Sequence, residues 1–182
     1  MPAPYRPSHT QSLAEASFST SPDRALALLI ERGALILDDD LQNLKAVASV
    51  CTDFLGIPET RVACVHARQG MSLHEIIEQT ENHLRSNISS TGTSFAGIIT
   101  DFKLSPSINS LEVWRAVDAS FSNTSYQTPW RQTGRVLMTA TLGEIAIKEA
   151  QTTGLIDSLI HKPFSLLQLE NALITSIQAR IG

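Results

Sequence analysis

The sequence predicts an α/β fold, built as a doubly wound, five-stranded parallel sheet with helices on both faces. Five short apolar segments alternate with segments whose apolar residues recur at helical spacing. This alternation is typical of parallel strands joined by crossover helices, because such strands are buried on both sides. The chain has 182 residues, of which 42% are hydrophobic, and this is enough apolar material for the core of one ordinary domain.

Two segments precede the alternating region. Residues 1–20 are rich in Ser, Pro, Thr and Ala without any periodicity, and we expect them to form a disordered tail. Residues 21–33 predict an extra N-terminal helix, which Ser21 can cap and Gly33 can end. The apolar run at 25–30 predicts that this helix packs on the rest of the domain or on a partner.

The main domain is predicted to span residues 34–182. Its strands are predicted at residues 34–37, 61–67, 96–100, 135–139 and 156–161. Its helices are predicted at residues 41–56, 72–86, 110–121, 142–154 and 165–179.

The first two strand–helix units follow from apolar patterning and from one helix-start signal. The first strand is the run ALIL, and the helix after it places Leu44, Val47 and Leu55 on one face. The second strand, RVACVHA, precedes a helix that opens with the capping-box residues Ser72 and Glu75. Both units therefore predict a helix that lies against the sheet.

The last three units repeat the same pattern. The third strand, AGIIT, ends at Asp101, and the helix SLEVWRAVDASF follows it. The fourth strand, RVLMT, precedes a helix that Gly154 can end. The fifth strand, IDSLIH, is followed at once by Lys162 and Pro163, and Ser165 can cap the last helix.

Two long polar segments, at 86–95 and 121–134, are predicted to be insertions in loops. Trp130 lies in the second of them, where exposure of its ring would indicate an interface with a partner. Cys51 and Cys64 fall in apolar stretches without metal-type spacing, and we expect both to be buried and reduced.

Polar residues follow four of the five predicted strands. Asp38 and Asp39 follow the first strand, Asp101 ends the third, Thr139 ends the fourth and Lys162 follows the fifth. Strands of a parallel sheet all point the same way, so these side chains should meet at the carboxyl edge, where α/β proteins bind ligands. Carboxylates, a hydroxyl and an ammonium group suit Mg²⁺ and phosphoryl transfer.

The third aspartate of the acidic run has a simpler interpretation. Asp40 directly precedes the helix predicted at 41–56. Its carboxylate can cap that helix and stabilise its positive end. We therefore favour capping over metal binding for Asp40.

The segments LILDDD, IITD, VLMTA and HKPF, in this order and at these strand ends, resemble the receiver domains of response regulators in two-component signalling. The resemblance covers roughly residues 34–180 and implies a chemotaxis-regulator-like, flavodoxin-like sheet with strand order 2-1-3-4-5. It implies that Asp38, Asp39 and Asp101 bind Mg²⁺ and that Asp101 accepts the phosphoryl group. It implies that Thr139 supplies the switch hydroxyl.

The resemblance assigns three further roles. It makes Lys162 the lysine that pairs with the phosphoryl group, and it implies a cis peptide bond before Pro163. The backbone carbonyl of Lys103 would complete the metal site. The implied function is a phosphoryl-accepting signalling domain, not an enzyme, whose partners are a sensor histidine kinase or histidine phosphotransfer protein and a downstream effector.

Two departures from the family pattern keep a second function open. The segment 102–110 lacks the Met-Pro and Asp-Gly pairs that usually follow the phosphoacceptor. Leu159 stands three residues before Lys162, where the family often has an aromatic switch residue. The alternative is a pseudo-receiver, which is an interaction scaffold that works without phosphorylation.

Composition excludes several other classes of protein. The net charge of −4 argues against direct binding to nucleic acid. We expect no membrane span and no signal peptide, because no apolar run is long enough and the first 20 residues lack an apolar core. A cytoplasmic, single-domain protein is therefore expected.

Overall fold

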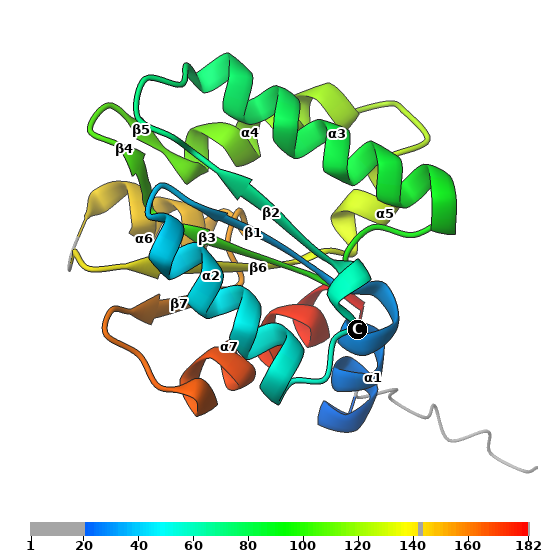
Figure 1. The fold of residues 1–182 in the computed structure, drawn as a ribbon. Helices are drawn as coiled ribbons and strands as arrows, with labels where there is room; N and C mark the ends of the chain where they lie inside the picture. The colour runs from blue at the N-terminus through cyan, green and yellow to red at the C-terminus, as the bar shows by residue number, and fades with distance from the viewer. Residues whose placement is uncertain (1–20, 142–143, 182) are drawn as a thin grey trace, which may run out of the picture.

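The computed structural model of the protein describes residues 21–141 and 144–181. The predicted tail, residues 1–20, lies outside the described residues. Five strands form one parallel sheet in the order β2-β1-β3-β6-β7, which confirms the predicted fold and strand order (Figure 1). These strands are β1 (Ala34–Asp38), β2 (Val62–His66), β3 (Gly97–Asp101), β6 (Gly134–Thr139) and β7 (Ser158–His161).

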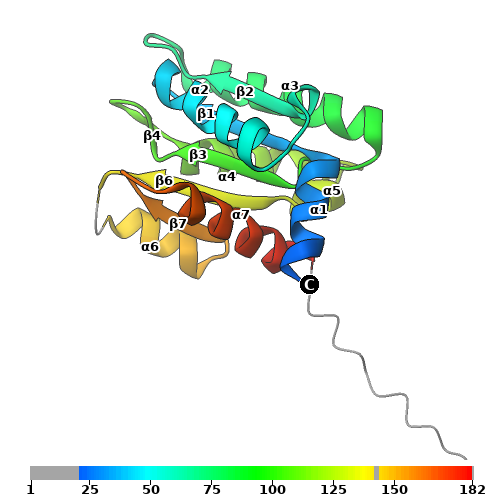
Figure 2. The same cartoon turned by 60° about the horizontal axis from the view of Figure 1, so that its bottom comes forward.

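Helices cover both faces of the sheet, as Figures 1 and 2 show. One face carries α3 (Leu73–Thr91), α4 (Ser110–Phe121), α5 (Gln127–Arg131) and α6 (Ile145–Thr152). The other carries α1 (Pro22–Arg32), α2 (Leu41–Ser49) and α7 (Leu166–Ile181). Strand β1 serves both cores, because Leu35 and Leu37 face the first layer while Ile36 faces the second.

The extra N-terminal helix packs on the domain. Ser21 caps α1 by accepting a hydrogen bond from the backbone of Arg24, and Ala25 and Leu29 are buried in the same core as α7. Gly33 ends the helix with a φ of +80° and leads directly into β1. A Cβ atom at Gly33 would lie 2.0 Å from the carbonyl oxygen of Arg61, so only glycine fits this junction.

Helices α2 and α6 depart from their predicted bounds. Helix α2 ends at Ser49 and continues as a π-helical turn, Val50–Phe54, so the predicted helix is present but not uniform. Helix α6 begins at Ile145 with Glu144 as its N-cap, whereas residues 142–143 of the predicted helix lie outside the described part. Among the described residues, none of the helices combines the length and the apolar composition that crossing a bilayer requires.

The two polar segments do not form long loops. Helix α3 continues to Thr91 and buries Ile88, so most of segment 86–95 is helical. Segment 121–134 contains α5, and Trp130 is only 1% exposed because it packs edge-on against Phe121. The interface interpretation of Trp130 is therefore wrong: the apolar area of its ring is used inside the domain.

Two smaller features differ from the sequence prediction. Cys51 is buried as expected, but Cys64 is exposed because it lies on β2, an edge strand of the sheet. The segment after Asp101 forms an antiparallel hairpin of β4 (Lys103–Ser105) and β5 (Ile108–Asn109), which the sequence analysis did not anticipate. Leu104 of this hairpin is fully buried, and its burial anchors the hairpin to the core.

Candidate functional site

The carboxyl edge of the sheet brings together the polar residues that follow the strands. Asp38 ends β1, Asp101 ends β3, Thr139 ends β6 and Lys162 follows β7. Strands β1 and β3 are neighbours, and the chain moves from β1 to β2 on one side and later to β3 on the other. The two aspartates therefore lie where the strand order reverses, which is the usual ligand position in open α/β sheets.

Lys162 lies between two of the carboxylates. Its Nζ atom is 3.3 Å from Oδ2 of Asp38 and 3.1 Å from Oδ2 of Asp101. The backbone N–H of Lys162 donates to the carbonyl of Thr139 at 2.8 Å, which fixes the lysine at the end of β7. One cation is thus shared by two acids, and their negative charge is only partly neutralised.

A third carboxylate joins this pair. One oxygen from each of Asp38, Asp39 and Asp101 lies within 4.8 Å of the others. Asp38 is fully buried, and its Oδ1 atom accepts a 2.8 Å hydrogen bond from the backbone N–H of Asp40. The three converging carboxylates offer oxygen ligands that fit a hard divalent cation such as Mg²⁺, and a single lysine offsets only part of their charge.

Asp40 does not belong to this oxygen cluster. Its carboxylate accepts hydrogen bonds from the backbone N–H groups of Gln42 at 2.7 Å and Asn43 at 3.2 Å. It is therefore the N-cap of α2, and the capping interpretation is confirmed.

The electrostatics of the edge favour protonation or neutralisation of the buried acids. Burial raises the pKa of Asp38 above its ordinary value, although the Asp40 N–H and Lys162 act in the opposite direction. Burial also raises the pKa of Asp101, and the nearby charge of Asp39 adds to the effect while Lys162 opposes it. Desolvation outweighs the single lysine at both positions, so a bound cation would relieve an unfavourable interaction.

Thr139 is 1% exposed and its hydroxyl is engaged by the loop that follows it. The hydroxyl accepts a hydrogen bond from the backbone N–H of Thr141 at 3.0 Å and lies 3.3 Å from the Thr141 carbonyl, to which it donates. This hydroxyl couples the end of β6 to residues that lead toward α6. A new partner for the hydroxyl would have to compete with the loop.

The remaining sequence-predicted residues take these positions. Lys103 begins β4, two residues after Asp101, so its carbonyl belongs to the same stretch of backbone as the acidic site. The Lys162–Pro163 peptide bond is cis, the conformation that the resemblance implies. Phe102, between Asp101 and Lys103, donates its backbone N–H to the Met138 carbonyl and ties the segment to β6.

One residue near the site was missed by the sequence analysis. His66 ends β2, and its Nε2 atom lies 3.1 Å from the backbone carbonyl of Asp39. This contact links the loop that carries Asp39 to the neighbouring strand. The signal that could have found it is the sheet register, which pairs His66 with Asp38.

Comparisons with known proteins agree with this geometry at the level of fold. No known family profile matches the sequence, and no curated protein matches it. The structure is similar to the receiver domain of the histidine kinase CKI1 from Arabidopsis thaliana, solved as a complex with Mg²⁺ and BeF₃⁻. The TM-score is 0.56 at 16% sequence identity, with 85% of this chain and 95% of that chain covered.

Two bacterial proteins are similar to a comparable degree. Chemotaxis protein CheY4 from Vibrio cholerae has a TM-score of 0.54 at 17% identity, with 79% of this chain and 96% of that chain covered. A two-component response regulator from Cytophaga hutchinsonii has a TM-score of 0.51 at 17% identity, with coverages of 76% and 91%. The chain therefore has the fold of the receiver domains of response regulators.

Proposed function

We propose that the protein is a phosphoryl-accepting receiver in two-component signalling and that Asp101 is the phosphoacceptor. The observation that carries the proposal is the position of Lys162, whose ammonium group contacts Asp38 and Asp101 at the carboxyl edge of a receiver fold. The partners that this function implies are a sensor histidine kinase or histidine phosphotransfer protein and a downstream effector. The first partner would donate a phosphoryl group from a phosphohistidine, and the effector would bind the surface that phosphorylation changes.

In the proposed reaction, a carboxylate oxygen of Asp101 attacks the phosphorus atom of the donor. A new P–O bond to Asp101 forms while the bond from phosphorus to the donor nitrogen or oxygen breaks, and the donor keeps that electron pair. Asp38, Asp39, Asp101 and the Lys103 carbonyl would hold Mg²⁺. When bound, Mg²⁺ would neutralise the negative charge on the transferring phosphoryl group.

The residues of this chain supply positioning and charge. Lys162 already lies 3.1 Å from Asp101 and can pair with one oxygen of the phosphoryl group. Asp101 is held in place because its Oδ1 atom accepts a 2.9 Å hydrogen bond from the Phe102 N–H, which leaves its Oδ2 atom toward Lys162. Phosphoryl transfer depends mainly on such preorganised charge, because its transition state is loose.

The readout would begin at Thr139. Its hydroxyl contacts Thr141 in the present state, and a phosphoryl oxygen on Asp101 offers it a stronger, charged acceptor. Transfer of that hydrogen bond would release Thr141 from the end of β6. Leu159 replaces the usual aromatic residue, so we propose that the readout depends on the Thr139 loop and not on a ring rotation.

The test is mass spectrometry after incubation with Mg²⁺ and acetyl phosphate. The wild-type protein should gain one base-labile phosphoryl group, Asp101→Asn should gain none, and Lys162→Ala should gain much less. Asp53→Asn, an exposed acid on the π-helical turn, is the matched control and should label like the wild type. Equal labelling of Asp101→Asn would show that the nucleophile lies elsewhere.

One observation favours the alternative, a pseudo-receiver scaffold. The hairpin of β4 and β5 occupies the segment after Asp101, which lacks the Met-Pro and Asp-Gly pairs usual in the family. If no variant and no wild-type sample gains a phosphoryl group while Mg²⁺ still binds, the scaffold function is the better one. A partner that binds Asp101→Asn and the wild type equally would support it further.

A further inference from the structure

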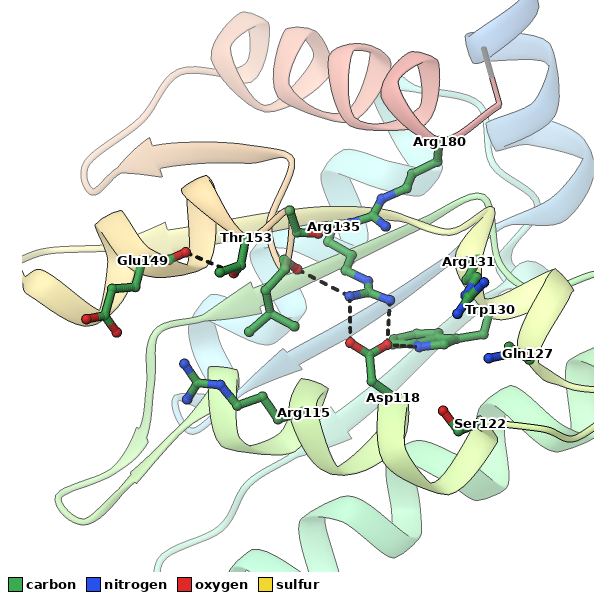
Figure 3. Close-up of a pocket in the computed structure, with 12 residues that line it drawn as sticks. Arg115, Asp118, Ser122, Gln127, Trp130, Arg131, Arg135, Glu149, Thr153 and Arg180 are labelled. Atoms are coloured by element: carbon green, nitrogen blue, oxygen red, sulfur yellow. Dashed lines mark hydrogen bonds and ion pairs between the residues drawn. The ribbon is translucent and has the colours of Figure 1, made fainter.

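A second polar pocket lies near the amino ends of the strands, on the opposite side of the domain from the acidic site at their carboxyl ends. It has a volume of about 680 Å³ and is lined by residues of α4, α5, α6, β6 and α7 (Figure 3). Arg135, which lines it, lies near the amino end of β6, whereas Thr139 ends the same strand at the acidic edge. This volume is in the range of pockets that bind small organic molecules.

The interior of the pocket is built around one buried arginine. Arg135 is 2% exposed, and its Nη2 and Nη1 atoms lie 2.8 Å and 3.3 Å from the two carboxylate oxygens of Asp118. Its guanidinium lies over the ring of Trp130, 4.3 Å from the ring centroid. Because the indole N–H of Trp130 also donates to Asp118, these three residues form a rigid, preorganised floor.

One donor of this floor has no partner in the part of the chain that the structure describes. The Nε atom of Arg135 is buried and makes no hydrogen bond to any described residue. Burial lowers the pKa of Arg135, and the nearby charge of Asp118 opposes the effect. The site thus contains a buried cation whose hydrogen-bonding capacity is not fully used, which is unusual in a folded protein.

The rim carries two more arginines, and neither has a partner among the described residues. Figure 3 places Arg115 on one side of the Asp118–Arg135 pair and Arg131, with Gln127, on the other. The side chains of Arg115 and Arg131 make no hydrogen bond or ion pair with any described residue. Both arginines are exposed, so a ligand can reach their guanidinium groups.

The balance of charge in the pocket is positive. Four arginines line it against two acidic residues, and the fourth arginine, Arg180, is already held by Asp157 at 2.9 Å. Free guanidinium groups on opposite sides of a preorganised floor match a ligand with negative groups toward both ends. A lone inorganic anion is too small to contact both sides of a pocket of this volume.

We infer that this pocket binds a small organic polyanion of about nucleotide size, whose phosphate or carboxylate groups pair with Arg115 and Arg131. The inference does not rest on the proposed phosphorylation, because it uses no residue of the acidic edge. Its ligand would therefore bind whether or not Asp101 accepts a phosphoryl group.

The test is calorimetric titration of the full chain in EDTA with three probes: ATP, citrate and inorganic phosphate. We expect saturable binding of ATP or citrate, and the probe that binds identifies phosphate or carboxylate as the preferred group. Arg115→Gln and Arg131→Gln should each weaken this binding by about tenfold or more, because each loses a charge-assisted hydrogen bond. Both side chains are exposed and have no partner within residues 21–141 and 144–181, so both variants should melt like the wild type.

Two controls separate this site from other sources of binding. Arg24→Gln removes an exposed arginine of α1 that does not line the pocket, and Asp101→Asn alters the acidic edge. Both should bind the probe as the wild type does. The inference is overturned if neither ATP nor citrate saturates, if Arg115→Gln and Arg131→Gln bind normally, if Arg24→Gln weakens binding equally, or if inorganic phosphate binds as tightly as the larger anions.

Discussion

A salt bridge of 3.3 Å joins Lys162 to Asp38, although 124 residues separate them in the chain. Asp38 is fully buried, and the backbone N–H of Asp40 and the ammonium group of Lys162 compensate for a charge that has lost its water. The same lysine also contacts Asp101 at 3.1 Å. Two acids that depend on one cation make the edge sensitive to cation binding, to pH and to loss of either partner.

Divalent cations should raise the stability of the protein. Millimolar Mg²⁺ should increase the melting temperature of the wild type, because a cation that binds only the folded cluster shifts the unfolding equilibrium. In Asp39→Asn the increase should be much smaller, since one of the three carboxylates is lost. Differential scanning calorimetry with Asp23→Asn, an exposed acid on α1, as the control would measure the difference. A wild-type melting temperature that does not respond to Mg²⁺ would contradict a cation site here.

Without a divalent cation, the protein should become more stable as the pH falls from neutral toward about 4. Asp38 and Asp101 have folded pKa values above their ordinary value of 3.8, so the folded state binds protons more readily than the unfolded state. Their unfavourable contribution is fully present above the folded pKa and disappears below 3.8. Urea unfolding in EDTA at several pH values would measure the gain.

A different acid produces the opposite effect at lower pH. Hydrogen bonds from Ser72 lower the pKa of Glu75 below its ordinary value of 4.5, so its contribution is lost only as the pH falls below that value. Asp101→Asn should reduce the gain between pH 7 and 4, whereas Glu75→Gln should not reduce it. A gain of the same size in Asp101→Asn would show that other groups are responsible.

Gly33→Ala should destabilise the protein strongly, by about 2 kcal/mol or more. The φ of +80° disfavours any side chain, and the new Cβ atom would lie 2.0 Å from the backbone carbonyl oxygen of Arg61. Neither the backbone nor the start of β2 can move without disturbing the sheet. Gly70→Ala is the matched control, because it has a φ of +90° but open space around the new atom. Chemical denaturation should show a clearly larger loss for Gly33→Ala than for Gly70→Ala.

Asp118→Ala should cost about 1–3 kcal/mol of unfolding free energy. The substitution leaves the Arg135 guanidinium buried without its acidic partner, and it removes the acceptor of the Trp130 indole N–H. The Asp118 side chain is 39% exposed, so solvent reduces the cost below that of a fully buried pair. Asp118→Asn keeps one acceptor and should lose less. Equal stability of Asp118→Ala and the wild type would show that Arg135 finds other partners.

The sheet and the acidic edge could be predicted from the sequence because both follow from local rules. The short apolar strands end in Asp38, Asp101 and Thr139. In a parallel sheet these carboxyl ends all lie at the same edge, so the three side chains are brought together. Helix patterning failed at segment 86–95, where Ile88 continues the apolar face of α3 but is surrounded by Ser, Thr and Asn. Because most residues in the last turns of α3 are polar, the sequence did not indicate that Ile88 is buried there.

The second pocket could not be predicted in the same way. Asp118, Trp130 and Arg135 come from three elements, and only the packed fold places them in contact. The one sequence signal was a charged residue in an apolar strand, Arg135 in RVLMT, which requires a buried partner. Nothing in the sequence identifies Asp118 as that partner, because α5 lies between Asp118 and Arg135 in the chain and its packing determines how close they come.

The strand order also determines how the domain can form during synthesis on the ribosome. In the order β2-β1-β3-β6-β7, each strand that emerges after β1 pairs with a strand that is already present. No strand therefore has to insert between two strands that are already paired. Strand β6 is the edge strand of the sheet until β7 has been synthesised. Lys162 follows β7, so a ribosome-bound chain that stops before it would carry the acids of the edge without their cation. The acidic site gains its lysine only after its last strand has been translated.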